Sequence, residues 1–363
     1  MARSSRAPNR IGLAAGLLTA ALMLSACTPE TPQPPPSSSA GQPTSAAPPE
    51  PSPPPIEGSS VHFTAQGDTG VGNGARKVLD VIAQLKPQLN LGLGDYTYMA
   101  GIEQQFCDLV TDKLGAGFPY EVVTGNHESD GHEGDIANIV KCLPNRLPGL
   151  QGEYGTQWYV DVPQQDPVVR IVMVSPGIDF RGGNPLDYSR GSERWRWTAE
   201  ALNGAKSRNI PWTVVGMHAP CFSLGNYGCQ PGEEFTNMLI EKKVDLVLAG
   251  HDHVYQRTHQ LGLSGGCPGL VPASFSSQCL ADTDDTMVQG AGTVFVGVGI
   301  GGIGHYNVHD DDPEVGYFAS WSGKNRNATL GTLDVTAGRD SLTARLVPAE
   351  GYSHTDAFEI RRK

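Results

Sequence analysis

Residues 61–98 of this 363-residue chain read VHFTAQGDTGVGNGARKVLDVIAQLKPQLNLGLGDYTY. The stretch opens with a strand-like run at 61–66, continues at 75–85 with apolar residues at helical spacing, and ends in a second apolar run at 89–94. A strand, a helix and a strand in succession predict a parallel βα unit, whose functional groups lie in the loops that follow the strands. Both strand-like runs lead into a Gly-Asp pair, so chemistry is expected at these two turns.

The same alternation continues along the chain. Helices are predicted over 104–114, 193–205 and 233–242, and strands over 120–124, 168–174, 212–217 and 244–248. After Gly250 only strand-like runs follow, at 255–260, 293–298, 331–335 and 341–347, which predicts a second, largely antiparallel sheet. Residues 262–290 are rich in Gly, Ser and Pro and are expected to form a long surface loop. The predicted fold class is therefore α/β, with two packed sheets flanked by helices.

The first 60 residues differ from the rest. Residues 1–10 carry three arginines and no acidic residue, and the apolar stretch 11–26 is shorter than the roughly 20 residues of a membrane span. Its end, Leu24-Ser25-Ala26-Cys27, resembles a bacterial lipobox, which predicts a lipoprotein signal peptide over 1–27 and a lipidated Cys27. An ordinary signal peptide with an incidental cysteine is the alternative reading.

Residues 28–60 hold twelve of the 28 prolines and almost no apolar side chains, so they are expected to form a disordered linker. Together these segments predict an exported cell-envelope lipoprotein on the outer face of a bacterial cell membrane. Its only contact with the membrane would be the lipid anchor, which leaves 61–363 as the domain expected to carry the chemistry.

Charge excludes one class of partner. The net charge is −12, from 26 basic and 38 acidic residues. Three of the basic residues are the arginines of residues 1–10, so the rest of the chain carries 23 basic residues against 38 acidic ones. A surface of that sign argues against nucleic-acid binding.

The cysteine count is consistent with export. Removing a lipidated Cys27 from the seven cysteines leaves six, and six thiols in an oxidising compartment predict three disulfides with fifteen possible connectivities. No Cys-x-x-Cys pair supports the competing reading of a metal-thiolate site. We favour pairing of sequence neighbours: Cys107 with Cys142, Cys221 with Cys229, and Cys267 with Cys279.

Five segments place metal-ligating side chains directly after apolar runs. They read Gly67-Asp68-Thr69-Gly70, Gly94-Asp95-Tyr96-Thr97-Tyr98, Gly125-Asn126-His127-Glu128, Val215-Gly216-Met217-His218 and Gly250-His251-Asp252-His253. Taken singly, the aspartates could be helix N-caps and the tyrosine a core aromatic. Because the strands of a parallel sheet end at one edge, however, all five segments can converge on one site.

The set resembles the metallophosphoesterases and, within them, the purple acid phosphatases. Their patterns D-x-G, G-D-x-x-Y, G-N-H-[ED], V-x-x-H and G-H-x-H all occur here in the family's order. The resemblance implies a four-layer αββα sandwich of two mixed sheets that carries a binuclear metal centre. It implies that Asp68, Tyr98 and His253 bind the first metal, that Asn126, His218 and His251 bind the second, and that Asp95 bridges them.

The donor types also indicate which ions fit. Imidazoles and an amide oxygen suit a borderline divalent ion such as Zn²⁺, Fe²⁺ or Mn²⁺. A phenol with an ordinary pKa of about 10 ionises near neutrality only on a strong Lewis acid, so Tyr98 predicts Fe³⁺ at the first site. The implied function is that of an acid phosphatase, which hydrolyses phosphomonoesters by attack of a metal-activated hydroxide.

The resemblance implies that His127 faces the substrate and protonates the departing alkoxide. This chain departs from the family after His218, because residues 219–229 contain none of the histidines that contact phosphate in the plant enzymes. Substrate contacts are therefore assigned only as weak candidates: His132, Asn226, Tyr227 and His305.

Two other functions remain open at this stage. A phosphodiesterase or nucleotide-cleaving enzyme would use the same scaffold, and a non-catalytic surface module would keep the fold and bind metal. The retention of His127 beside a full ligand set speaks against the non-catalytic module.

Overall fold

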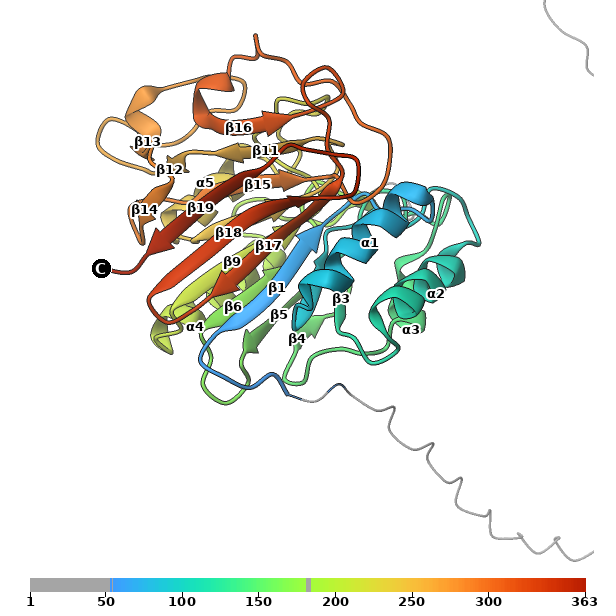
Figure 1. Ribbon diagram of the computed structural model, residues 1–363. Coiled ribbons are helices and arrows are strands. Elements are labelled where there is room, and N and C mark those ends of the chain that lie inside the picture. The colour runs from blue at the N-terminus through green and yellow to red at the C-terminus, as the bar shows by residue number, and fades with distance from the viewer. Residues whose placement is uncertain (1–52, 54, 181–183) are drawn as a thin grey trace, which may run out of the picture. The chain divides into compact units, whose positions relative to one another are not determined.

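The computed structural model describes residues 53, 55–180 and 184–363 (Figure 1). The predicted signal peptide, the lipobox Cys27 and most of the predicted linker lie outside the described residues. Ile56, which the sequence places in the linker, is buried against the core, so packed structure begins a few residues earlier than Val61. Its proline-rich surroundings concealed this one apolar side chain in the sequence. Within the described part of the chain, no helix is both long and apolar enough to cross a membrane.

One of the two large sheets has seven strands. Strands β1, β2 and β3, at one side of the sheet, run parallel. Strand β17 pairs antiparallel with β1, β18 and β19 continue antiparallel, and β14 lies parallel to β19 at the other edge. In sheet order the strands are β14 (Thr286–Val288), β19 (Asp356–Arg361), β18 (Ser341–Pro348), β17 (Gly331–Ala337), β1 (Val61–Gln66), β2 (Leu89–Gly92) and β3 (Tyr120–Val122).

The other large sheet has eight strands. Four of them, β6, β9, β10 and β15, run parallel, and antiparallel strands complete the sheet on both sides. In sheet order the strands are β16 (Phe318–Ser322), β11 (Tyr255–Thr258), β15 (Val294–Val298), β10 (Leu246–Ala249), β9 (Trp212–Met217), β6 (Val169–Met173), β5 (Gln157–Val162) and β4 (Gln151–Glu153).

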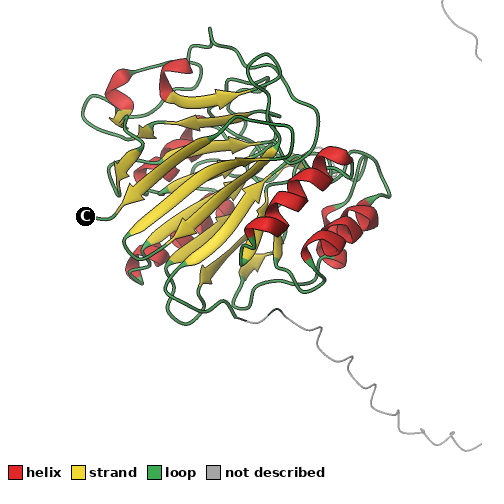
Figure 2. Cartoon of the chain, in the orientation of Figure 1, coloured by secondary structure: helices red, strands yellow, loops and turns green. Residues whose placement is uncertain are grey.

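Helices cover the outer faces of the two sheets. Figure 2 shows the strands in the middle of the domain with the helices around them. The helices α1 (Asn73–Leu85), α2 (Glu103–Leu114) and α3 (Ile136–Cys142) pack with the seven-stranded sheet, and α4 (Glu193–Ser207) and α5 (Glu233–Glu241) with the eight-stranded sheet. Two mixed sheets flanked by helices confirm the predicted αββα architecture.

The largest core cluster lies between the sheets. Phe63 and Leu91 from the seven-stranded sheet and Trp158, Val214 and Leu248 from the eight-stranded sheet belong to it, and all five are fully buried. Each such side chain contributes about 1.5–3 kcal/mol by leaving water. The parallel strands read as continuous apolar runs because both of their faces are covered.

The strands after Gly250 correct one prediction. They do not form a second sheet of their own: β11, β15 and β16 join the eight-stranded sheet, whereas β17, β18 and β19 join the seven-stranded one. An alternating pattern identifies a strand but carries no information about its partner. The prediction of a largely antiparallel second sheet was therefore wrong.

Residues 262–290 are also more than a loop. They contain a short 3-10 helix, Ser277–Cys279, and two three-residue strands, β13 (Leu280–Asp282) and β14, and β13 pairs with β12 (Gln260–Leu261). Strands so short carry little periodicity, which is why the sequence did not reveal them. Helix α3 and strands β4, β5, β16 and β19 were missed as well, together with the two-residue pair β7 (Asp179–Phe180) and β8 (Asn184–Pro185).

The structure contains three disulfides, and they join sequence neighbours. Cys107–Cys142 ties α2 to α3, Cys221–Cys229 closes the loop after β9, and Cys267–Cys279 lies within the 262–290 segment. Of the fifteen connectivities, this is the one that the sequence analysis favours.

One buried carboxyl group makes stability depend on pH. Glu121 on β3 accepts hydrogen bonds from the Leu147 N–H at 2.7 Å and from the Tyr154 hydroxyl at 2.8 Å. Burial nevertheless raises its pKa from 4.5 to about 7. The folded state therefore binds a proton more tightly than the unfolded state, and stability that is present below pH 4.5 is lost as the pH rises through about 7.

We predict that Glu121→Gln, which cannot ionise, removes this pH dependence. Between about pH 5 and about pH 8 the native chain should lose roughly 3 kcal/mol more of its unfolding free energy than the variant does. Urea unfolding at both pH values measures the difference, and all other titrating groups are common to the two proteins. Parallel pH profiles for the two chains would contradict the assignment.

Candidate metal centre

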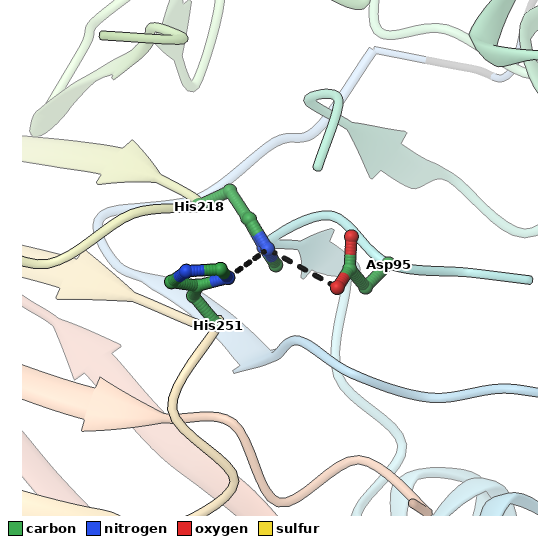
Figure 3. A group of neighbouring side chains, drawn as sticks. All are labelled: Asp95, His218 and His251. Atoms are coloured by element: carbon green, nitrogen blue, oxygen red, sulfur yellow. Dashed lines mark hydrogen bonds and ion pairs between the residues drawn. The ribbon is translucent and has the colours of Figure 1, made fainter. Parts of the chain in front are cut away.

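Loops from both sheets meet at one edge of the sandwich. From the seven-stranded sheet, Asp68 follows β1, Asp95 and Tyr98 follow β2, and Asn126 and His127 follow β3. From the eight-stranded sheet, His218 follows β9, and His251 and His253 follow β10. Figure 3 shows the side chains of Asp95, His218 and His251 pointing toward one another. The carboxyl ends of two separate sheets thus supply a single site.

The turns that present these residues are strained. The backbone φ angles of Asp68, Asp95 and His251 are 62°, 56° and 70°, in the left-handed region that residues other than glycine rarely adopt. Such conformations cost about 1–3 kcal/mol each and persist only where the surroundings hold them. Hydrogen bonds from Asp68 N to Gly94 O at 3.0 Å and from His251 N to an Asp68 carboxylate oxygen at 2.8 Å do so here.

Gly94 has to be a glycine for two reasons. Its φ of +86° disfavours a side chain, and a Cβ there would lie 2.7 Å from Nδ1 of His218. The absence of a side chain lets the β2 turn approach the β9 histidine closely.

One cluster of donor atoms surrounds Nε2 of His218. Oδ1 of Asn126 and Nδ1 of His251 each lie 3.1 Å away, and Oδ2 of Asp95 lies 3.2 Å away. Asp95, His218 and His251 are buried, and their donor atoms all lie within 4.8 Å of one another. The predicted ligands of the second metal, with the predicted bridge, are therefore brought together.

A second cluster has the shape of a triangle. The Tyr98 hydroxyl lies 3.4 Å from Oδ1 of Asp68 and 3.4 Å from Nε2 of His253, and the latter two atoms are also 3.4 Å apart. These are the three residues that are predicted to bind the first metal and not the second.

The spacing within both clusters fits metal ligation. Atoms bound at about 2.1 Å to one ion lie roughly 3.0–3.4 Å apart at octahedral or tetrahedral angles. The histidine tautomers also fit, since Nδ1 of His218 lies 2.7 Å from Leu93 O and Nδ1 of His253 lies 2.8 Å from Gly304 O. A proton on each Nδ1 satisfies these carbonyls and leaves both Nε2 lone pairs free for a cation.

The pKa values in the cluster around His218 also fit a bound cation. Burial alone would lower the pKa of His218, but the Asp95 carboxylate outweighs it and the pKa rises to about 10. His251 responds oppositely, because burial and the neighbouring His218 lower its pKa to about 3. The surroundings of His218 therefore favour a positive charge at the point where Asp95, Asn126 and His251 meet. A metal ion bound there would supply that positive charge.

His127 lies at the rim of the centre. Its Nε2 is 3.6 Å from Oδ2 of Asp95, its Nδ1 is 2.5 Å from Oε2 of Glu133, and its ring lies 4.2 Å from the Tyr98 ring. Its side chain is 22% exposed, whereas that of His218 is fully buried. His127 is thus placed beside both clusters with access to solvent.

The weak candidates separate into two pairs. Asn226 and Tyr227 lie in the disulfide-closed loop after β9, and the Tyr227 ring stacks on His251 with centroids 3.9 Å apart. His132 is exposed, with Nε2 3.9 Å from a carboxylate oxygen of Asp130. Nε2 of His305 is bound to the Thr329 carbonyl at 2.8 Å. Of the four candidates, Tyr227 is the one whose side chain contacts a predicted ligand.

Three further residues of the site were missed. Glu128 accepts hydrogen bonds from the N–H groups of Asp95 at 2.9 Å and Gly125 at 2.5 Å, and burial together with Asp95 raises its pKa to about 8. Asp252 accepts from the Ser223 hydroxyl at 2.5 Å. Both lie inside the motif segments, adjacent to predicted ligands, which was an available signal. Tyr306, which stacks on His253, lies in no such segment.

The sequence was compared with known protein families and with curated proteins. The sequence profile of the calcineurin-like phosphoesterases matches residues 61–255. The chain is 26% identical over 217 residues to purple acid phosphatase 18 of Arabidopsis thaliana, covering 57% of this chain and 47% of that protein. It is 24% identical over 218 residues to a phosphoenolpyruvate phosphatase of Allium cepa, covering 56% and 43%. The chain thus spans about half the length of these curated relatives.

A solved structure shares the fold. A purple acid phosphatase isolated from yellow lupin (Lupinus luteus) seeds superimposes with a TM-score of 0.63 at 18% identity. The superposition covers 86% of this chain and 55% of the lupin chain.

Proposed function

This chain belongs to the calcineurin-like phosphoesterase family, and from that premise we propose that it is an exported, lipid-anchored acid phosphatase with two metal ions that hydrolyses phosphomonoesters. The observation that carries the proposal is the pair of donor clusters, with interatomic distances of 3.1–3.4 Å, built from loops of both sheets. When bound, two such ions hold a phosphoryl oxygen, lower the pKa of water and neutralise the charge of the transition state.

The residues divide the work as follows. Asn126, His218 and His251 would hold a divalent ion, either Zn²⁺, Fe²⁺ or Mn²⁺. Asp68, Tyr98 and His253 would hold Fe³⁺, and Asp95 would be shared. Asp95 is suited to sharing because one of its oxygens lies among the donors around His218, and its charge also raises the pKa of Tyr98 in the other cluster.

Ferric iron is supported by the surroundings of Tyr98. Burial raises its pKa well above 10, and the carboxylates of Asp68 and Asp95 raise it further. The phenol therefore ionises only when a strong Lewis acid binds its oxygen, and Fe³⁺ is the common biological ion of that strength.

We expect the purified protein to show a visible phenolate-to-iron charge-transfer band, and Tyr98→Phe to abolish it. Tyr352→Phe should leave the band unchanged, because this tyrosine packs on His305 and against the α1 core cluster and is not one of the predicted ligands. Absorption spectra recorded with elemental analysis measure both effects. A native protein that holds two metals and no iron, or a band that survives in Tyr98→Phe, would refute the ferric assignment.

His127 would deliver a proton to the departing oxygen. It stands outside both clusters, it is partly exposed, and Glu133 fixes its Nδ1 side. A leaving alkoxide needs such a proton, whereas a nitrophenolate leaves without one.

The proposed activity predicts a substrate preference. The metal-loaded protein should cleave p-nitrophenyl phosphate with a kcat/KM roughly 100-fold above that for bis(p-nitrophenyl) phosphate. His127→Ala should slow the hydrolysis of an alkyl phosphate roughly 100-fold or more and that of the aryl phosphate by much less. Steady-state kinetics on the three esters measures this. Faster diester cleavage would favour the phosphodiesterase alternative, equal losses in the variant would remove the acid role, and no turnover of any ester would leave a non-catalytic module.

Export and anchoring are supported by the sequence features of residues 1–60. The lipobox-like Leu24-Ser25-Ala26-Cys27 would fix the chain to lipid, and the proline-rich linker would hold the catalytic domain away from the membrane.

We expect the native chain, expressed in a bacterium, to incorporate radiolabelled palmitate and to sediment with membranes, whereas Cys27→Ala should do neither. The cause is the loss of the thiol that carries the lipid. An unlabelled native chain would indicate an ordinary signal peptide instead.

A further inference from the structure

Two tyrosines from separate loops cover the histidines of the metal centre. The Tyr227 ring stacks on His251 with centroids 3.9 Å apart and planes at 28°, and the Tyr306 ring stacks on His253 at 4.1 Å and 11°. The two tyrosine rings are 6.3 Å from each other. One ring therefore lies over a histidine of each donor cluster, and the two rings are neighbours.

Their hydroxyl groups lie together near the donor atoms. The pKa of the Tyr306 hydroxyl is raised by burial first, and then by the neighbouring Tyr227 and by Asp68. Tyr306 in turn contributes to the raised pKa of Tyr98, after burial and the nearby carboxylates. The Tyr306 hydroxyl is thus within electrostatic reach of the oxygens of the Tyr98 cluster. A phenol carries an O–H group that can donate a hydrogen bond.

The loop that carries Tyr227 is held in place. The Cys221–Cys229 disulfide closes it, Asp252 accepts hydrogen bonds from Ser223 Oγ at 2.5 Å and Asn226 N at 2.8 Å, and Gln256 accepts from Leu224 N at 2.8 Å. Asp252 lies between the two stacked histidines in the sequence. The same segment that supplies the donors therefore also fixes Tyr227.

Tyr306 is fixed from two sides. Its N–H donates to the carbonyl of His253 at 3.1 Å, and its own carbonyl accepts from Lys324 N at 2.7 Å. The two tyrosines therefore reach the centre from independently anchored segments, one after β9 and one after β15.

Exposure distinguishes this pair from core aromatics. Tyr227 is 37% exposed and Tyr306 is partly exposed, although one face of each ring rests on a buried histidine. A phenol that was only a packing element would bury its hydroxyl against protein acceptors. Here each ring packs on a buried histidine of a donor cluster and still keeps part of its surface open to solvent.

We propose that Tyr227 and Tyr306 form a hydroxyl pair that binds the phosphoryl group of the substrate. The O–H groups donate to the phosphoryl oxygens that face away from the metal ions, and charge-assisted bonds of this type are short and strong. The inference rests on the proposed function, and it names the residues that take the place of a basic side chain at this position. The recognised chemistry is the phosphate dianion, whatever alcohol it esterifies.

The test removes each hydroxyl and keeps each ring. Tyr227→Phe and Tyr306→Phe preserve the stacking on the histidines, so metal content by elemental analysis should equal that of the native protein. The probe is inorganic phosphate, titrated calorimetrically into the metal-loaded full chain. Each variant should bind phosphate roughly tenfold more weakly. The double variant should bind phosphate more weakly than either single variant, because both hydroxyls donate to the same phosphoryl group.

Tyr159→Phe is the matched control, since this tyrosine lies on β5 and packs on Trp197. It should bind phosphate as the native chain does. In kinetics, both site variants should raise the KM of alkyl and aryl monoesters by the same factor, since the phosphoryl group is common to both.

Three results would overturn the inference. Unchanged phosphate binding in both variants removes the pair from recognition. A KM increase confined to aryl substrates means that the rings contact the organic group instead. A loss of metal shows that the tyrosines act on the ligands. If the native chain binds phosphate through the pair but hydrolyses no ester, the proposed function fails and the pair stands. If the native chain hydrolyses esters and the variants bind phosphate normally, only the pair fails.

Discussion

The hydrogen bond from the His251 backbone to the Asp68 carboxylate joins the two sheets at the edge where the donor clusters lie. The apolar core between the sheets is strong but non-directional, and it would tolerate small sliding of one sheet over the other. Polar bonds at the carboxyl edge remove that freedom. Two more hydrogen bonds join the sheets at the same edge. One links the His218 ring to Leu93 O, and the other is donated by the Gly67 N–H to Val298 O. Donor atoms from the two sheets can therefore keep spacings that a cation requires.

The same junction explains why strain and buried charge collect there. Left-handed aspartates and histidines are unfavourable alone, and buried carboxylates are costly without partners. Here each carboxylate receives backbone N–H groups, Asp68 from His251, Asp95 from His127, and Glu128 from Gly125. The rigid sandwich on either side keeps these turns from relaxing. An array of donors is thus held in place before any ion or substrate binds.

Much of the fold and most of the donor residues could be predicted from the sequence. An apolar run that ends in Gly-Asp or Gly-His indicates both a strand and the turn that carries its functional residue. Sheet membership of the late strands was not readable, since partners are chosen by contacts across the whole chain. The neighbours His305 and Tyr306 illustrate the remaining limit. The sequence analysis named His305, which follows the Gly-rich run 297–304, whereas the neighbouring Tyr306 is the residue whose ring contacts a predicted ligand and His305 bonds to the Thr329 carbonyl.

The position of β1 also has a consequence for how the chain reaches its native state. This first strand lies in the middle of its sheet, and its antiparallel partner β17 pairs Ala337 with Val61. Until almost the entire polypeptide is available, one edge of β1 therefore stays open, and the loops that carry the donor residues have no complete sheet beneath them. Contacts so distant in sequence close slowly. Assembly of this domain should thus be a late event, in which the last strands of the chain complete the sheet that carries Asp68, Asp95, Tyr98 and Asn126.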